Sequence, residues 1–176
     1  DMQEIGVQLV ALQEKGTIAD YESFISTYES RLHPHHYHLI TAKHSLLQML
    51  GRQEGSLIQD MPWEDLQRKE ALCRQVVDVC FKLDPCMVRL PIYAGVALYE
   101  LHLPLLQYGK RKWETGELPT EEFRKLLVEP HDYMLQAMTL LKDEVNDKLP
   151  EGQMRLQCKD TLAQLEQFMK TIGCEI

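Results

Sequence analysis

Histidines are the densest group of chemically capable side chains in this sequence. Four of them, at 33, 35, 36 and 38, fall within six residues, and imidazole is the commonest protein ligand for transition metals. His35 and His38 have the spacing of three that lets a helix bring two imidazoles to one ion. No carboxylate or cysteine lies nearby in the sequence to complete a tetrahedral set. We therefore predict no metal ligands, and interpret the His33–His38 cluster as a solvated helix start rather than as structural zinc or adventitious metal binding.

A second pair with chemical potential is His102 with Glu100, which together could act as a general base. Residues two apart project from different sides of a helix, so we interpret His102 as a packed histidine that makes a hydrogen bond. The sequence has no G-x-S-x-G, Walker loop, G-x-G-x-x-G or H-E-x-x-H motif. We predict no catalytic and no cofactor-binding residues in this chain.

Cysteine spacing and net charge restrict the environment and the partners. The five cysteines are odd in number and form no C-x-x-C pair, which argues against the usual zinc frameworks and favours free thiols in a reducing compartment. The net charge of −8 argues against a nucleic acid or an anionic membrane as partner. No apolar run is long enough to span a membrane, and the first 14 residues lack the plan of a signal peptide. We expect a soluble protein of the cytoplasm, the nucleus or both.

Apolar residues recur at spacings of three and four through most of the chain, which is the pattern of amphipathic helices. Glycine, proline and capping residues mark the expected ends. Seven helices are predicted. The first four are Met2 to Gly16, a second helix capped by Asp20, Pro34 to Gly51, and a fourth that begins at Asp60 or Pro62 and ends at Asp84. The last three are a helix from Pro91 toward Tyr108 with a kink at Pro104, a helix capped by Thr120 with a bend at Pro130, and Met154 to Ile172. The segment 52–61 is expected to be a loop. The fourth helix is expected to carry apolar side chains on two faces.

We expect these helices to form antiparallel hairpins in one all-α domain that covers residues 1–176. Pairing the first with the second, the third with the fourth and the fifth with the sixth gives the outline of a tetratricopeptide array. The closest match to that repeat is Leu106–Gly109 followed by Trp113 and Gly116, where Gly109 would let two helices approach. Because a 34-residue period does not recur, we predict a degenerate tetratricopeptide-like array with a C-terminal capping helix. A generic helical bundle is the alternative.

The stretch Arg89–Leu106 resembles a block from the C-terminal region of the SET-and-MYND (SMYD) proteins, particularly the insect branch. Leu32–Tyr37, followed by Lys43 and Leu46, is similar to the same region, as is Gly109–Arg111 with Trp113 and Gly116. The resemblance implies a tetratricopeptide-like C-terminal lobe of a protein-lysine methyltransferase. Such a lobe is non-catalytic, packs against the parent's own SET domain and shapes the substrate cleft.

The resemblance also implies partners and cofactors. The lobe would bind partner peptides, such as chaperone tails or histone and non-histone substrates. S-adenosylmethionine and zinc are implied for the parent protein only, because the family's zinc-binding cysteines and catalytic residues have no counterparts here. The alternative is a free-standing tetratricopeptide-like adaptor. For the acidic terminus of a peptide we predict Arg89, Lys110 and Arg111 as cationic contacts, with Tyr99 as an aromatic wall.

Overall fold

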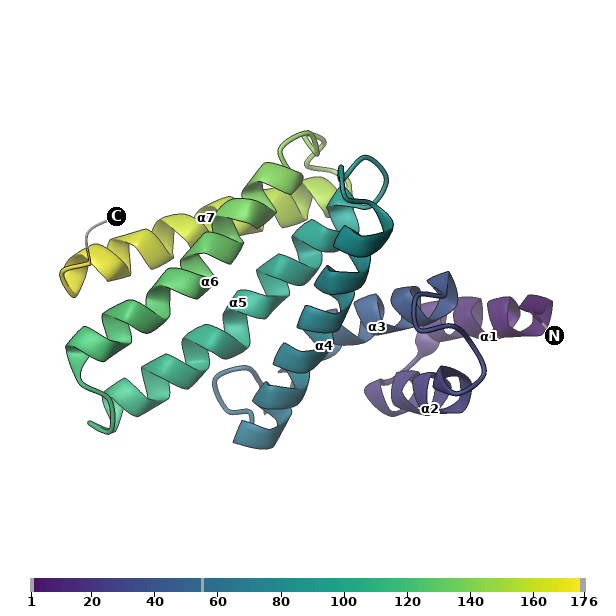
Figure 1. The fold of residues 1–176 in the computed structure, drawn as a ribbon, viewed down its shortest axis with the longest axis horizontal. Coiled ribbons are helices and arrows are strands. Elements are labelled where there is room, and N and C mark those ends of the chain that lie inside the picture. Colours follow the sequence, from purple (N-terminus) through teal and green to yellow (C-terminus); the bar gives the residue numbers. More distant parts are fainter. Residues whose placement is uncertain (1, 55, 175–176) are drawn as a thin grey trace. The chain divides into compact units, whose positions relative to one another are not determined.

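The computed structural model describes residues 2–54 and 56–174, and it has an all-α fold built from helical hairpins (Figure 1). Over this part of the chain the predicted seven helices are confirmed. None of the described helices is long and apolar enough to cross a membrane. The elements are α1 (Met2–Lys15), α2 (Ile18–Glu29), α3 (Tyr37–Met49), β1 (Arg52–Gln53), β2 (Ser56–Leu57), α4 (Trp63–Leu83), α5 (Pro91–Glu114), α6 (Thr120–Leu140) and α7 (Pro150–Thr171).

The chain divides into two compact units, one up to Met61 and one from Pro62 onward. The first unit contains α1, α2, α3 and the short antiparallel pair of β1 and β2. Here α3 packs against both α1 and α2, and the Tyr28 hydroxyl donates a hydrogen bond of 2.7 Å to Gln8. The predicted pairing of the third helix with the fourth spans the boundary between the units.

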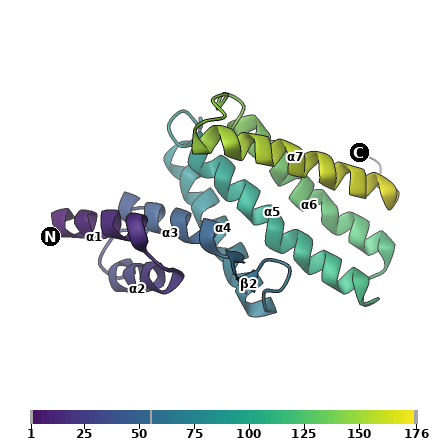
Figure 2. The ribbon, with the colours of Figure 1, turned by 180° about the vertical axis from the view of Figure 1, so that it is seen from behind.

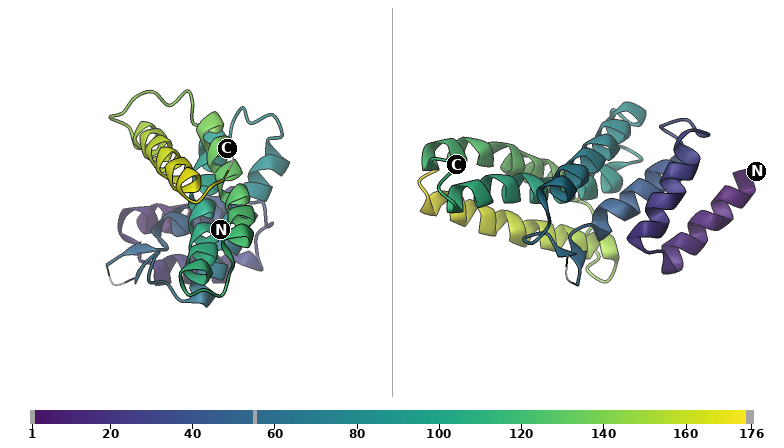
Figure 3. Two further views of the ribbon diagram at one scale, coloured as in Figure 1. Left: turned by 90° about the vertical axis from the view of Figure 1, so that its left-hand side faces the viewer. Right: turned by 90° about the horizontal axis from the view of Figure 1, so that it is seen from below.

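In the second unit α5 is the central helix. It packs against α4 and α6, and α7 lies along one face of the α5–α6 hairpin (Figures 2 and 3). Residues 94–102 of α5 are all buried, as expected for a helix with apolar residues around its whole circumference. The main core joins α5, α6 and α7 through Val96, Leu98, Tyr99, Phe123, Leu127, Met134, Ala137, Leu141, Met154, Cys158, Leu165 and Met169.

Two predicted helix starts in the first unit are wrong, and the capping contacts explain why. Thr17 caps α2: its hydroxyl accepts the backbone N–H of Asp20, and the Asp20 carboxylate accepts the backbone N–H of Thr17. Asp20 is therefore the second member of a capping box, not the cap. His36 caps α3 by accepting the backbone N–H of His38 at its Nδ1. Pro34 therefore lies in the turn before the helix.

Later boundaries differ from the prediction in smaller ways. Thr120 is the first residue of α6 and not its cap; its hydroxyl instead accepts a hydrogen bond of 3.1 Å from the Trp113 indole. Helix α7 begins at Pro150, because proline is tolerated in a first turn that needs no N–H donor. The predicted loop after α3 contains β1 and β2. Leu83 is 51% exposed, so the second apolar face predicted for α4 does not continue to its end.

The predicted close approach of two helices at Gly109 is confirmed. A Cβ atom built there would lie 3.0 Å from the Phe123 ring on α6. We expect Gly109→Leu to lower the free energy of unfolding by about 1–3 kcal/mol, because the added side chain overpacks the α5–α6 contact. Lys112→Leu, on the outer side of the same helix end, should leave stability almost unchanged. Urea denaturation of both variants tests this, and equal losses would contradict it.

Candidate functional site

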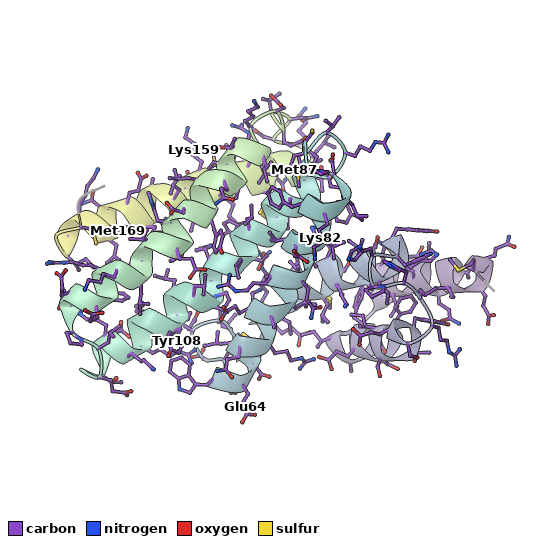
Figure 4. All side chains as sticks on the ribbon, viewed as in Figure 1. Glu64, Lys82, Met87, Tyr108, Lys159 and Met169 are labelled. Carbon is purple, nitrogen blue, oxygen red and sulfur yellow. The ribbon has the colours of Figure 1, made fainter. Side chains whose placement is uncertain are left out.

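The cations predicted to bind a peptide terminus do not form one site. Arg89 precedes α5, whereas Lys110 and Arg111 lie near its C-terminal end, about 30 Å further along the helix axis at 1.5 Å per residue. Figure 4 shows this separation through two labelled neighbours, Met87 and Tyr108, which lie at opposite ends of α5. A single peptide carboxylate therefore cannot contact all three cations.

Two basic residues at the end of α5, Arg111 and Lys112, pack against aromatic side chains. The Arg111 guanidinium lies over the Trp63 ring, 5.3 Å from its centroid, and Trp63 packs edge-on against Tyr108. The Lys112 ammonium lies 4.4 Å from the Tyr108 ring centroid and donates a hydrogen bond of 2.7 Å to its hydroxyl. Cation–π contacts of this kind fix a cation on the surface without burying it.

Tyr99 is a core residue and does not offer its ring as the wall of an open groove. It is 3% exposed, because α5 is covered by its neighbouring helices. Its hydroxyl lies 3.3 Å from the Thr161 hydroxyl on α7. Tyr99 therefore ties α5 to α7, and this was not predicted from the sequence.

His102 is packed and hydrogen-bonded, as the sequence predicted. It is 1% exposed, and its Nδ1 donates to the backbone carbonyl of Tyr99. A carbonyl only accepts, so Nδ1 carries the proton and Nε2 carries a lone pair. Nε2 has no hydrogen-bond partner among the described residues. Burial lowers the pKa of His102 to about 4, and the nearby Lys69 ammonium acts in the same direction, so the ring is neutral near pH 7.

A cavity of about 200 Å³ lies beside His102, between α5 and α7. Both of its walls are helix stripes, with residues at spacings of three and four that face one another across the gap. The walls are formed by His102, Leu106 and Lys110 from α5, and by Thr161, Gln164, Leu165 and Phe168 from α7.

Glu100, which was considered as a partner for His102, is instead paired with Lys69. Lys69 Nζ donates a hydrogen bond of 2.7 Å to Glu100 Oε2, and both side chains are completely buried. This ion pair joins α4 to α5. This pair was not predicted from the sequence, because a lysine within a charged stretch of helix resembles a solvated residue.

The buried thiols are unsuited to nucleophilic chemistry. All five cysteines are free, and burial raises the pKa of Cys73 and Cys158 to about 12. A thiol with such a pKa contains almost no thiolate at neutral pH, and the thiolate is the nucleophile.

In the first unit, an open groove of about 600 Å³ runs between α1 and α3. Its lining includes Val7 and Val10, which are 66% and 57% exposed, and Tyr37, which is 63% exposed. His38 lines the groove but is only 3% exposed. A Cβ on Gly6 would lie 3.4 Å from the His38 ring, so the small residue on α1 lets this ring pack closely.

The histidine cluster at the start of α3, His33 to His38, makes contacts within itself. His33 Nδ1 accepts the backbone N–H of His35, and the His36 and His38 rings lie 5.1 Å apart. Burial, and secondarily His36, lower the pKa of His38. Among residues 2–54 and 56–174, no three His, Cys, Asp or Glu side chains are arranged to hold a metal ion.

No family model, curated protein or solved structure matches this chain. Any functional assignment therefore depends on the residues and their arrangement. Among the described residues, the α1–α3 groove in the first unit and the α5–α7 cavity in the second are candidate sites.

Proposed function

We propose that this chain is a non-catalytic, protein-binding helical domain and that the α1–α3 groove is its contact surface. The observation that carries the proposal is the exposure of Val7, Val10 and Tyr37 around one open groove. Single exposed apolar residues are common, but apolar side chains gathered around a groove are typical of a surface that another protein covers.

The finer proposal is that the domain is the C-terminal lobe of a SMYD-type protein-lysine methyltransferase. It is supported by the similarity of Arg89–Leu106 to that family, a segment that includes the whole buried stretch 94–102 of α5. The second similar segment, Leu32–Tyr37, leads into α3, which forms one side of the groove. In this role the lobe packs against the SET domain, shapes its substrate cleft and binds partner peptides. S-adenosylmethionine and zinc would be bound by the rest of the parent protein.

The reading frame upstream of Asp1 tests the finer proposal directly. We expect it to encode a SET domain with a MYND zinc module, and a frame without a SET segment would refute the assignment to this family. The isolated chain should transfer no methyl group from S-adenosylmethionine to histones. If the isolated chain binds an acidic C-terminal peptide and no SET segment is encoded, the free-standing adaptor is the correct assignment.

The double variant Val7→Glu, Val10→Glu tests the groove. Both side chains are exposed, so we expect the thermal midpoint to change little. Binding to the SET segment supplied as a separate chain should weaken at least tenfold, because two carboxylates would be desolvated in the interface (about 1.4 kcal/mol per factor of ten). Titration calorimetry measures the affinity.

The matched control is Val128→Glu with Val145→Glu. These valines are 52% and 71% exposed and belong to the second unit, so the control has the same charge change outside the groove. It should bind as the unsubstituted chain does. Equal weakening by the two double variants would show that the α1–α3 groove is not the contact surface.

A further inference from the structure

We infer that the α5–α7 cavity binds a small amphipathic acid that carries a hydroxyl group. The hydroxyl donates to His102 Nε2, the apolar body lies between Leu106 and Phe168, and the carboxylate reaches Lys110. This site belongs to the second unit and does not depend on the proposed use of the α1–α3 groove.

His102 determines which group of the ligand is buried. Its Nδ1 is used by the Tyr99 carbonyl, and its Nε2, the nitrogen further from the helix backbone, has no partner among the described residues. Leaving a buried acceptor without a donor costs free energy. The neutral imidazole lines the cavity with almost no accessible surface at Nε2, so it must turn slightly before a ligand that donates, such as a hydroxyl group, can satisfy this acceptor. It does not favour a bare carboxylate, which is an acceptor only.

The cavity walls determine the size and polarity of the middle part of the ligand. Leu106, Leu165 and Phe168 offer apolar contacts and the face or edge of one ring, and the polar Thr161 and Gln164 also line the cavity. The volume of about 200 Å³ is below the range of roughly 300–1,000 Å³ typical of sites for drug-sized ligands. One aromatic ring with a short chain fits this volume, whereas a nucleotide cofactor does not.

Lys110 determines which group the ligand carries at its opposite end. It lies eight residues after His102 on the same stripe of α5, about 12 Å along the helix. Its side chain is 44% exposed, and its ammonium lies 3.7 Å from a Glu114 carboxylate oxygen, which is longer than a tight charge-assisted hydrogen bond. An exposed ammonium at the edge of the cavity can pair with a carboxylate that stays partly hydrated, so no unpaired charge is buried.

The probe that tests this inference is 3-(4-hydroxyphenyl)propionate, whose hydroxyl and carboxylate lie at opposite ends of one ring. We expect saturable binding to the intact chain and a change in the ¹⁵N shift of His102 Nε2 when the phenol donates to it. 3-Phenylpropionate, which lacks the hydroxyl, should bind at least tenfold more weakly. The propionamide analogue, which lacks the negative charge, should also bind more weakly, by a factor that shrinks at high salt.

Two variants locate the probe. Leu106→Trp should fill the cavity and abolish binding, and His102→Phe should remove the preference for the hydroxylated acid. His131→Phe is the matched control, because His131 is also a mostly buried histidine of the second unit but is paired with Glu166; it should retain both binding and preference. Circular dichroism confirms that each variant is folded. Should the probe leave the His102 Nε2 shift of the unsubstituted chain unchanged at millimolar concentration, or the two acids bind equally, the inference is overturned.

Discussion

Lys69→Met is expected to lower the free energy of unfolding by about 3–5 kcal/mol, the typical loss when one member of a buried ion pair is removed. Lys69 and Glu100 are both completely buried and joined by a hydrogen bond of 2.7 Å. The substitution leaves the Glu100 carboxylate in the interior without its counter-charge, while the methionine keeps most of the volume of the lysine stem. Guanidinium denaturation followed by circular dichroism measures the loss.

The double variant Lys69→Met, Glu100→Leu separates charge from packing. Replacing both charges with apolar groups of similar size is often close to neutral, so the double variant should recover most of the stability that the single variant loses. Lys82→Met is the exposed control: Lys82 is paired with Asp78 on the surface of α4, and both side chains are more than half exposed. It should cost less than about 1 kcal/mol. A loss at Lys82 as large as that at Lys69 would contradict the assigned role of the buried pair.

The buried ion pair also shows where prediction from the sequence stops. Helix spans depend on local spacing, so the stripes of α1, α4 and α7 could be located within a few residues. Lys69, by contrast, lies between Arg68 and Glu70, and its charge suggested a solvated residue although it shares the buried stripe of Leu66 and Cys73. Its burial depends on a carboxylate 31 positions later, on another helix. A contact of that kind depends on how helices pack, which helical periodicity does not specify.

The candidate sites were predictable only in parts. Helical spacing predicts two stripes, one with His102 and Lys110 and the other with Leu165 and Phe168. The sequence does not indicate that these two stripes face each other. Basic residues near Tyr99 suggested a peptide site, and the structure instead buries Tyr99 and separates Arg89 from Lys110. The predicted cap of α2 was wrong for a similar reason. Thr17 and Asp20 both suit a helix start, and only the backbone geometry decides which one is the cap.

The second large effect concerns pH and His102. Its pKa is lowered from an ordinary 6.5 to about 4, chiefly by burial. Between these values the unfolded chain binds a proton that the folded chain excludes, so the stability due to the neutral ring is present above pH 6.5 and is lost as the pH falls. At 1.36 kcal/mol per pKa unit, His102 alone should lower the free energy of unfolding by about 3 kcal/mol between pH 7 and pH 4. Urea titrations across this range measure the dependence.

Carboxylates and other histidines also titrate in this range, so the informative quantity is the difference between the chain and its His102→Phe variant. His38, whose pKa is also lowered by burial, is present in both proteins and cancels from that difference. The groups that act on His102 are also retained: the Lys69 ammonium on α4 lowers its pKa, and the hydrogen bond to the Tyr99 carbonyl on α5 raises it. The unsubstituted chain should therefore lose stability more steeply than the variant below pH 6.5. Parallel pH dependences for the two proteins would mean that His102 is not held neutral in the core, and would also remove the neutral acceptor proposed for the α5–α7 cavity.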